Sequence, residues 1–476
     1  MNKPEFDICV VGGGAAGLVV AAGGASLGAK VALVEKHKMG GDCLHYGCIP
    51  SKTLLQSAKV AHTMRSADQA AIPAHTPTPD ITTVMERVAS VIKSIEPHDS
   101  PERFHDLGVD VILGAGKFTS PDTFTADGRE ITAKHFVIAT GSRATVPSID
   151  GINETPYLTN EQVFDLREPV PSLIVIGGGP IGIEMAQAFG RLGSKVYVVQ
   201  RDSQILPRED ADMAAVVAEQ LDNEGIELLT GHNTVCVEGS AGDIRLLLND
   251  SQGQEKTVRA SHLLIAAGRK TNIENLGLEA AGVETQNGRI ISDARLRTSN
   301  KRIYVAGDVV GGPQFTHMAE HHAGIVLRNT IFRLPAKVEQ KVIPWATFCD
   351  PELARVGLSE TEAKQQGIAH TAYTFPFQDM DRARADGTTN GFAKIITSPK
   401  GKLLGAAIVG PHAGELIHEY VLAIAKGMKA SDLSSVIHIY PTLAQINRRV
   451  ADARMKEGLT PNAKKWIQRI FGLRGE

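Results

Sequence analysis

The run Gly12-Gly-Gly-Ala-Ala-Gly17 decides the fold, because it stands between a short apolar stretch, residues 7–11, and a segment rich in small residues. A glycine turn between a strand and a helix is typical of a βαβ unit that holds a dinucleotide. Gly12 is expected to make the turn, Gly14 to let a pyrophosphate approach the backbone, and Gly17 to let the helix pack closely. The free N–H groups at the start of that helix would then face the pyrophosphate.

The same pattern occurs a second time further along the chain. An apolar stretch at 173–176 runs into Gly177-Gly-Gly-Pro-Ile-Gly182, and a second strand is expected at 195–200. Gly177, Gly179 and Gly182 take the places of the three glycines in the first copy. An isolated glycine motif is weak evidence, but an internal repeat of a whole βαβ unit predicts two dinucleotide sites.

The residues that end the second strand of each copy distinguish the two sites. Glu35 ends the first and can accept hydrogen bonds from both ribose hydroxyls, which suits FAD or NAD. Gln200 and Arg201 end the second, where no carboxylate would repel a 2′-phosphate and an arginine would attract it. This favours NADPH at the second site, with NADH close behind. The plainer alternative is that Arg201 is only solvated and Gln200 suffices for a ribose.

A pair of cysteines follows the first unit, in Gly40-Gly-Asp-Cys43-Leu-His-Tyr-Gly-Cys48-Ile-Pro-Ser-Lys52. Zinc ligation is one alternative, but further ligands are missing nearby, so no metal site is predicted. Two buried thiols are another alternative. Against both, the pair opens a helical stretch at 51–60, and a helix N-terminus stabilises thiolates. Cys43 and Cys48 are therefore candidates for a pair that cycles between dithiol and disulfide.

These motifs, in this order over nearly the whole chain, resemble the class I pyridine nucleotide–disulfide oxidoreductases, and among them the mercuric-reductase-like and dihydrolipoamide-dehydrogenase-like flavoproteins. The resemblance implies an α/β fold: two Rossmann-like dinucleotide-binding domains as in glutathione reductase, and an α+β C-terminal dimerisation domain. It implies an FAD domain at 1–150, an NAD(P) domain at 151–270, a central domain completing the FAD site at 271–343, and a dimerisation domain at 344–476. It also implies FAD, NADPH or NADH, and a homodimer.

Roles for single residues follow from the same resemblance. Cys48 matches the flavin-proximal thiol, Cys43 the interchange thiol that attacks the substrate, Lys52 the lysine near flavin N5, and Glu184 its ion-pair partner beside the nicotinamide. A positive charge near N5 stabilises reduced flavin. The remaining matches to the FAD site are Gly41, Gly116, Thr140, Gly141, Asp308, Gln314, Phe315, Thr316 and His317. Gly268 and Arg269 match a turn near the nicotinamide nucleotide.

The C-terminal segment departs from the family's disulfide reductases. Their partner-supplied His and the Glu that orients it are replaced by Tyr440 and Gln445. A tyrosine with a pKa of about 10 is a poor base near neutral pH but can donate a hydrogen bond. His438 lies two residues earlier; either it reaches the site, or, more commonly, it is an ordinary histidine with its hydrogen bonds satisfied.

The sequence thus predicts an enzyme, an FAD-dependent NAD(P)H:disulfide or dithiol oxidoreductase. Dihydrolipoamide dehydrogenase is one alternative. Another is a reductase of a metal ion, quinone or oxidant resembling mercuric reductase, since the usual His–Glu pair is absent. A third alternative is a non-catalytic flavoprotein subunit that docks through its C-terminal tail.

Composition narrows the class of protein further. With 50 Lys and Arg against 53 Asp and Glu, the net charge is −3, which gives no basic excess for nucleic acid. Five cysteines exclude a secreted disulfide scaffold. The uncharged run 8–29 is long enough to mimic a membrane span, but its many glycines and the acidic residues before it argue against a span or a signal peptide. A cytoplasmic protein is expected.

Two features lie outside the main motifs. Cys9 and Cys236 fall in apolar strands and are expected to be buried and inert, and Cys349 has a small chance of being a redox-active thiol. The tail, residues 460–476, is basic and has apolar residues at helical spacing. Such a helix more often docks on its own domain, and contact with a membrane surface is the less common alternative.

Overall fold

The computed structural model describes residues 3–339 and 341–475, and its first sheet is built around β1 (Phe6–Val11). β1 lies between two parallel neighbours, and the sheet has seven strands in all. The order is β3 (Val109–Leu113), β2 (Val31–Glu35), β1, β6 (Arg129–Ile138), β5 (Thr123–Ala126) and β4 (Gly116–Ser120), with β18 (Ile303–Val305) also paired to β6. β4, β5 and β6 form an antiparallel meander that extends the parallel part.

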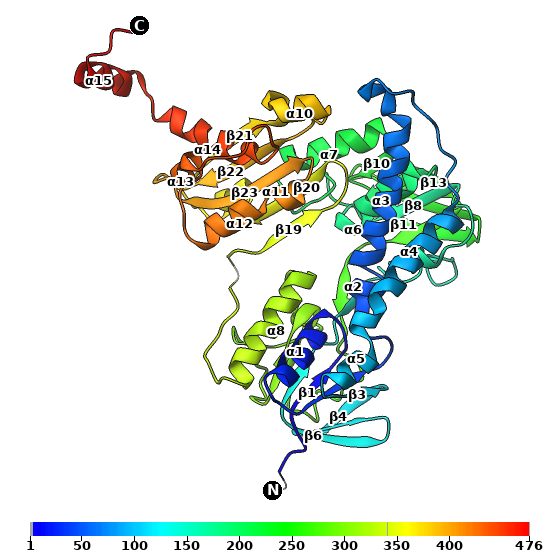
Figure 1. Cartoon of the computed structure of the whole chain (residues 1–476). Coiled ribbons are helices and arrows are strands. Elements are labelled where there is room, and N and C mark those ends of the chain that lie inside the picture. The colour runs from blue at the N-terminus through cyan, green and yellow to red at the C-terminus, as the bar shows by residue number, and fades with distance from the viewer. Residues whose placement is uncertain (1–2, 340, 476) are drawn as a thin grey trace.

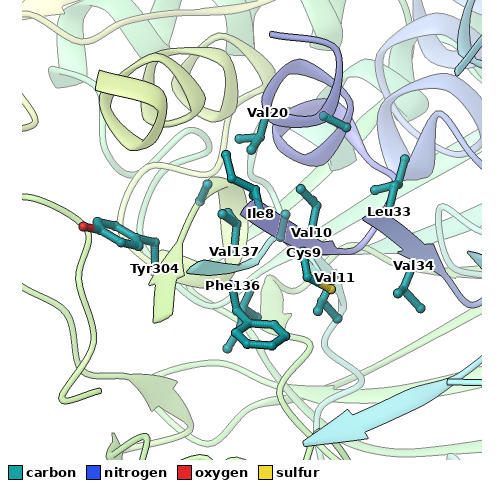
Figure 2. Close-up of a cluster of buried hydrophobic side chains, with 14 of the residues drawn as sticks. Ile8, Cys9, Val10, Val11, Val20, Leu33, Val34, Phe136, Val137 and Tyr304 are labelled. Atoms are coloured by element: carbon teal, nitrogen blue, oxygen red, sulfur yellow. The ribbon is translucent and has the colours of Figure 1, made fainter. Parts of the chain in front are cut away.

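The centre of this sheet is buried on both faces, as its continuous apolar strands predict. Side chains of β1 and β6 pack against Val20 of helix α1 (Ala15–Ser26) on one side and around Phe136 on the other (Figure 2). Helix α8 (Thr316–Thr330) lies beside α1, and its residues Ala323 and Val326 belong to the same core. The described residues from Leu276 to Val338 therefore contribute to the core of the first domain.

The second sheet repeats the parallel part of the first. Its order is β10 (Glu227–Thr230), β9 (Lys195–Gln200), β8 (Ser172–Ile176) and β14 (His262–Ile265), all parallel. An antiparallel meander again accompanies it: β11 (Asn233–Ser240), β12 (Asp243–Asn249) and β13 (Glu255–Ala260). The helices of this domain are α6 (Pro180–Arg191) and α7 (Ala211–Asn223). The repeat predicted from the glycine runs is confirmed.

The C-terminal domain is built on an antiparallel sheet, as its alternating strands predict. Its order is β19 (Pro344–Thr347), β20 (Glu352–Gly357), β23 (Leu403–Gly410), β22 (Phe392–Thr397) and β21 (Thr371–Pro376). The helices are α9 (Glu360–Gln365), α10 (Asp381–Asp386), α11 (Ala413–Leu416), α12 (His418–Ala425), α13 (Ala430–Ser435), α14 (Gln445–Glu457) and α15 (Pro461–Phe471). The fold is thus α/β with a glutathione-reductase-like arrangement, as expected.

Two long helices of the first domain reach over to the second. These are α3 (Cys48–Arg65), which packs against α6, and α4 (Ile81–Ile95), which packs against α3. One hydrophobic cluster contains Leu54 of α3, Phe189 of α6 and Leu353 of β20, so all three parts of the chain meet in it. The shorter helices here are α2 (Gly41–His45) and α5 (Pro101–Asp106). A small antiparallel pair, β7 (Ser142–Ala144) and β15 (Arg269–Thr271), also joins the first two domains.

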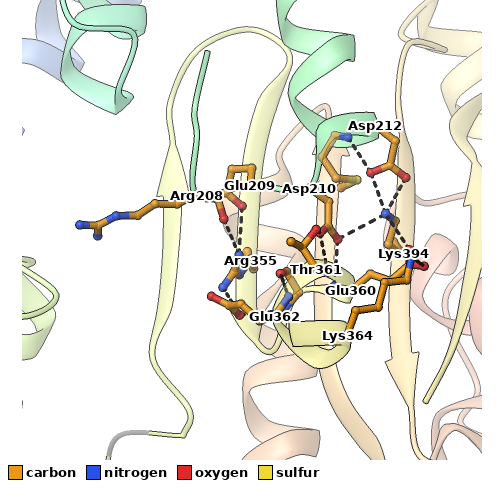
Figure 3. Close-up of polar contacts among 12 residues, drawn as sticks. Arg208, Glu209, Asp210, Asp212, Arg355, Glu360, Thr361, Glu362, Lys364 and Lys394 are labelled. Atoms are coloured by element: carbon orange, nitrogen blue, oxygen red, sulfur yellow. Dashed lines mark hydrogen bonds and ion pairs between the residues drawn. The ribbon is translucent and has the colours of Figure 1, made fainter. Parts of the chain in front are cut away.

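A network of charged side chains, centred on the buried Lys394 and Arg355, links the second domain to the C-terminal domain (Figure 3). Lys394 Nζ of β22 lies 3.4 Å from Asp210 Oδ2 and 2.5 Å from Asp212 Oδ2, at the start of α7. Arg355 of β20 lies between Glu209 and Glu362. Although burial opposes it, hydrogen bonds from Thr361 and the charge of Lys394 lower the pKa of Asp210 to about 2. The carboxylate is therefore ionised and holds the two domains together.

Three details differ from the sequence-based expectations. Helix α3 begins at Cys48, three residues before the expected start, so the cysteine itself occupies the first turn. Cys236 is half-buried, because β11 belongs to a meander with one exposed face. The tail helix α15 has no fully buried side chain, so the structure does not show the apolar core contact that docking on its own domain would give. Among the described residues, no helix is both long and apolar enough to cross a membrane.

Candidate active site

A single cavity of about 2860 Å³ connects the features that the sequence singled out. Both glycine turns line it, together with Cys43, Cys48, Lys52 and Glu184. The carboxyl ends of parallel strands meet at the same edge of a sheet, so each turn opens at the crevice where such folds bind nucleotides. The geometry thus places two dinucleotide turns and a thiol pair around one space.

The glycines fall into two classes according to what a Cβ atom would meet. A Cβ on Gly17 would lie 1.8 Å from the carbonyl oxygen of Gly12, and one on Gly182 would lie 1.9 Å from that of Gly177. At these two positions any larger residue would clash with the backbone of the protein. A Cβ on Gly14 would meet no protein atom closer than 3.8 Å, and one on Gly179 would meet none within 4 Å. The open space beside these two glycines fits a pyrophosphate at each turn.

The residues at the strand ends hold the two turns in the same way. Glu35 Oε2 accepts a hydrogen bond from the backbone N–H of Gly13 at 2.6 Å, and Gln200 Oε1 accepts one from Gly178 at 2.8 Å. Arg201 is exposed, and its Nε lies 3.8 Å from Asp202 Oδ1. This neighbouring carboxylate partly offsets the attraction of the arginine for a phosphate.

Cys43 and Cys48 come from two consecutive helices, α2 and α3, and both are free thiols. Cys48 Sγ lies 3.5 Å from the hydroxyl oxygen of Thr316, at the start of α8. A hydrogen bond from Cys43, aided by Thr316 and the charge of Lys52, lowers the pKa of Cys48 to about 6 in spite of burial. The same hydrogen bond and burial raise the pKa of Cys43. Near neutral pH the pair therefore consists of a Cys48 thiolate and a Cys43 thiol.

An ion pair connects the thiols to the second domain. Lys52 Nζ lies 2.8 Å from Glu184 Oε2, and the Glu184 carboxylate is buried in α6. The backbone N–H of Phe348 donates to Glu184 Oε1 at 2.9 Å, and the Phe348 ring lies 4.5 Å from Lys52 Nζ. Phe348 was not predicted from the sequence, although the next residue, Cys349, was considered as a redox-active thiol. Three domains thus contribute to this one pair.

Asp308 lies in a polar cluster that also lines the cavity. Ser142 Oγ donates to Asp308 Oδ2 at 2.6 Å. Arg269 Nε donates to Ser142 Oγ at 2.8 Å, and its guanidinium lies 3.0 Å from Asp42 Oδ2. Burial raises the pKa of Asp308, while Ser142 and Arg269 oppose this. The Arg269 side chain therefore turns toward the carboxylates of the first domain's site, whereas the sequence associated it with the nicotinamide.

The other matched residues also line the cavity. The Phe315 ring stacks on His317 at 5.2 Å and on Trp345 at 6.1 Å between centroids. Burial lowers the pKa of His317, whose Nε2 is 2.8 Å from the Pro344 carbonyl oxygen. The further lining residues named from the sequence are Gly41, Gly116, Thr140, Gly141, Gln314 and Gly268. Trp345, which sequence reasoning did not identify, extends this aromatic wall from β19.

Tyr440, His438 and Gln445 are absent from the described lining of the cavity. The Tyr440 hydroxyl is exposed and donates to Asp381 Oδ2 at 3.1 Å, and this hydrogen bond raises the tyrosine pKa. Both ring nitrogens of His438 are in contact with acceptors of its own domain, 3.0 Å from Glu419 and 3.1 Å from the Val436 carbonyl. Gln445 starts α14. The histidine has the satisfied environment that the simpler interpretation predicts.

The other cysteines do not join the thiol pair. Cys9 and Cys349 are buried, and burial raises the pKa of both thiols. A buried thiol that stays protonated is a poor nucleophile, so the structure gives no support to a redox role for Cys349. No group of three or more metal-ligating side chains was found among the described residues.

Replacing Lys52 by methionine should weaken the Cys48 thiolate, because the lysine charge contributes to its lowered pKa. A group with a lowered pKa keeps its charge down to lower pH, so loss of the cation shifts the titration upward. We expect the Cys48 pKa to rise from about 6 by roughly one unit. The measurement is the pH dependence of alkylation by iodoacetamide, with Lys59→Met of the same helix as control. An unchanged titration would contradict the contact.

Comparison with known proteins gives one consistent result. Residues 6–323 match the family model described as pyridine nucleotide-disulphide oxidoreductase, and residues 343–450 match the dimerisation domain of the same family. The chain is 35% identical to a mercuric reductase of Bacillus cereus over 443 residues, covering 93% of this chain and 70% of the relative. It is 35% identical to a dihydrolipoyl dehydrogenase of Geobacillus stearothermophilus over 458 residues, covering 95% and 96% of the two chains.

A solved structure extends this comparison. The structure is the Cu(II) complex of the HOCl-induced flavoprotein disulfide reductase RclA from Escherichia coli. It superposes with a TM-score of 0.84 at 28% identity, and the match covers 94% of this chain and 99% of that one. The arrangement of domains is therefore shared over almost the full length.

Proposed function

Since the chain belongs to the class I pyridine nucleotide–disulfide oxidoreductase family, we propose that it reduces a disulfide substrate with electrons from NAD(P)H through Cys43 and Cys48. It is a flavin-dependent oxidoreductase of a family that uses FAD and NAD(P)H. The observation that carries the proposal is the single cavity shared by two dinucleotide turns, the thiol pair and the Lys52–Glu184 ion pair.

The glycine turns would hold the two dinucleotides, with FAD at Gly12–Gly17 and the nicotinamide nucleotide at Gly177–Gly182. Bound FAD would supply the relay that accepts a hydride from the nicotinamide and passes its two electrons to the Cys43–Cys48 disulfide. Lys52 places a positive charge beside the thiols, and Glu184 fixes its position. We propose NADPH as the preferred donor because Arg201 lines the second site, although Asp202 makes the preference small.

The thiol pair then completes the reaction by two exchanges. The sulfur of Cys43, once deprotonated, attacks one sulfur of the substrate disulfide, and the other substrate sulfur leaves as a thiol after taking up a proton. Cys48, already a thiolate near neutral pH, attacks the Cys43 sulfur and releases the second substrate sulfur as a thiolate, which takes up a proton from solvent. The Cys43–Cys48 disulfide that results takes back two electrons from NAD(P)H, which balances the cycle.

We propose a homodimer, because the C-terminal segment is the family's dimerisation domain. In such a dimer Tyr440 would approach the partner's cavity, since it is exposed and lies outside the cavity of its own chain. Tyr440 would then donate a hydrogen bond at the site, held by Asp381, and would not act as a base.

A second candidate function rests on that tyrosine. The raised pKa of Tyr440 and the amide of Gln445 leave no proton-shuttling pair at the position where the family's disulfide reductases carry one. A substrate that needs little proton transfer, such as a metal ion or quinone, suits this site better than a dithiol. Similarity to proteins named mercuric reductase is compatible with this candidate.

The deciding experiment is a stopped-flow panel with the purified holoenzyme, reduced by NADPH or by NADH. Lipoamide, glutathione disulfide, Hg(II), Cu(II) and quinones are mixed with the reduced enzyme, and reoxidation is followed. Rapid turnover of a disulfide supports the first proposal. Slow reaction with every disulfide, together with rapid reaction with a metal ion or quinone, would replace it with the second.

Restoring the missing pair gives a sharper test of the role of Tyr440. The double variant Tyr440→His, Gln445→Glu should raise kcat/KM for lipoamide near neutral pH by about 10²-fold, the lower range of general acid–base catalysis. The control is Tyr440→His alone, whose imidazole lacks an orienting carboxylate and should gain less. Equal activities of wild type and double variant would show that proton transfer does not limit the reaction.

A further inference from the structure

The tail helix α15 is a well-formed helix whose large apolar side chains are all exposed. Its first turn is capped by Thr460, whose side chain accepts from the backbone N–H of Ala463 at 3.2 Å, and it ends at Gly472 in the left-handed conformation. None of its side chains is buried. Figure 1 shows α15 at the far end of the molecule, beyond α14 and away from the first domain.

The side chains of α15 divide between two faces. With 3.6 residues per turn, Trp466, Ile467, Ile470 and Phe471 lie on one side. Trp466 is 67% exposed and Phe471 is 71% exposed. A large aromatic surface of this kind in water is unfavourable by about 25 cal/mol per Å² and marks an interaction site.

The charges of the helix are all of one sign. Lys464, Lys465 and Arg469 lie within it, and no acidic residue occurs between Pro461 and Phe471. Lys464 and Arg469 fall on opposite borders of the apolar face, and Lys465 lies behind it. Side chains at such borders can extend to lipid headgroups while the aromatic rings enter the acyl boundary.

We propose that α15 lies in the surface of an anionic lipid bilayer and holds the enzyme there. The charge complementarity between an all-cationic helix and anionic headgroups selects this occupant, and the exposed tryptophan suits the interface. The helix is joined to α14 by only three residues, 458–460. It does not line the cavity, so binding to the bilayer leaves the redox site accessible.

Sedimentation with vesicles tests the proposal on the full-length holoenzyme. Wild type should bind vesicles of phosphatidylcholine with phosphatidylglycerol and should bind pure phosphatidylcholine far more weakly. Because each cation contributes about a fivefold factor, the variant Lys465→Glu, Arg469→Glu should bind at least about 25-fold more weakly. The matched control is Lys93→Glu, Lys400→Glu, which makes the same change of charge elsewhere on the surface and should bind as wild type does.

A spectroscopic readout locates the contact at the helix itself. Tryptophan emission should shift to the blue when anionic vesicles are added, and Trp466→Phe should lose this shift while it still binds. The variant Trp466→Ser, Phe471→Ser, which removes the two aromatic side chains, should not sediment with the vesicles. NAD(P)H–ferricyanide activity of each tail variant checks that the enzyme is intact.

Two results would overturn the proposal. Equal binding to neutral and anionic vesicles, or no binding to either, would contradict the proposal that α15 binds an anionic bilayer. If Trp466→Ser, Phe471→Ser instead changed the molar mass of the protein in solution without lipid, α15 would be a contact between two copies of the chain. Neither result would affect the redox function, because the stopped-flow panel is carried out without lipid.

Discussion

Substitution of Cys48 by serine will remove the disulfide reductase activity, with a loss of at least about 10³-fold in kcat. The physical reason is the charge distribution of the pair. Cys48 carries the lowered pKa of about 6, so it is the thiolate that closes the enzyme disulfide in the second exchange. A serine hydroxyl cannot form that bond. The long-wavelength absorbance of a thiolate beside oxidised flavin should disappear in the same variant.

The comparison variant Cys43→Ser separates the two roles. It should lose the disulfide activity as well, because Cys43 attacks the substrate, but it should keep the absorbance band without prior reduction, since Cys48 remains as a thiolate. A serine at position 43 can still donate a hydrogen bond to Cys48, as the thiol does. Persistence of the band in Cys48→Ser, or its loss in Cys43→Ser alone, would reverse the assignment.

Substitution of Gly17 by alanine will have the largest effect on folding. The added methyl group would lie 1.8 Å from the carbonyl oxygen of Gly12, and this oxygen belongs to a backbone that cannot move without opening the turn. We expect destabilisation of more than about 4 kcal/mol, the range reached only by severe clashes. Thermal unfolding and the amount of flavin per chain are the measurements.

Two other glycines serve as references for this variant. Gly324 lies in helix α8 with no atom near its added Cβ, so Gly324→Ala should leave the protein as stable as wild type or more stable by up to about 1 kcal/mol. Gly14→Ala should fold, because its Cβ has room, but should bind FAD less tightly. Wild-type stability and flavin content in Gly17→Ala would show that the turn can relax.

Much of the site could be predicted because it is encoded in local runs of sequence. The two glycine turns and the spacing from Cys43 to Lys52 each depend on a few consecutive residues, and the repeat placed both on strand ends. Glu184 lies two residues after the second glycine run, so its position in α6 could also be predicted from the sequence. The central strands at 7–11 and 173–176 were likewise marked by apolar residues.

The parts that were missed depend on contacts between distant segments. Phe348 reaches Glu184 and Lys52 only because the C-terminal domain docks on α6, and no periodicity in its own segment encodes that docking. Arg269 turns toward Asp42 and Asp308 because their carboxylates lie in reach once the domains have assembled. Whether the apolar face of α15 is covered depends on which other segments reach it. The amphipathic pattern of the helix alone does not determine this.

The hydrophobic cluster shared by Leu54, Phe189 and Leu353 has a thermodynamic consequence. Each of the three domains would expose part of its own apolar interior if it separated from the others, and separation of the second and C-terminal domains would also leave members of the charge network around Lys394 and Arg355 without their partners. Separating any one domain from the others therefore carries a cost in exposed apolar surface. This shared interior couples the stabilities of the three domains, although each domain also has a buried cluster of its own.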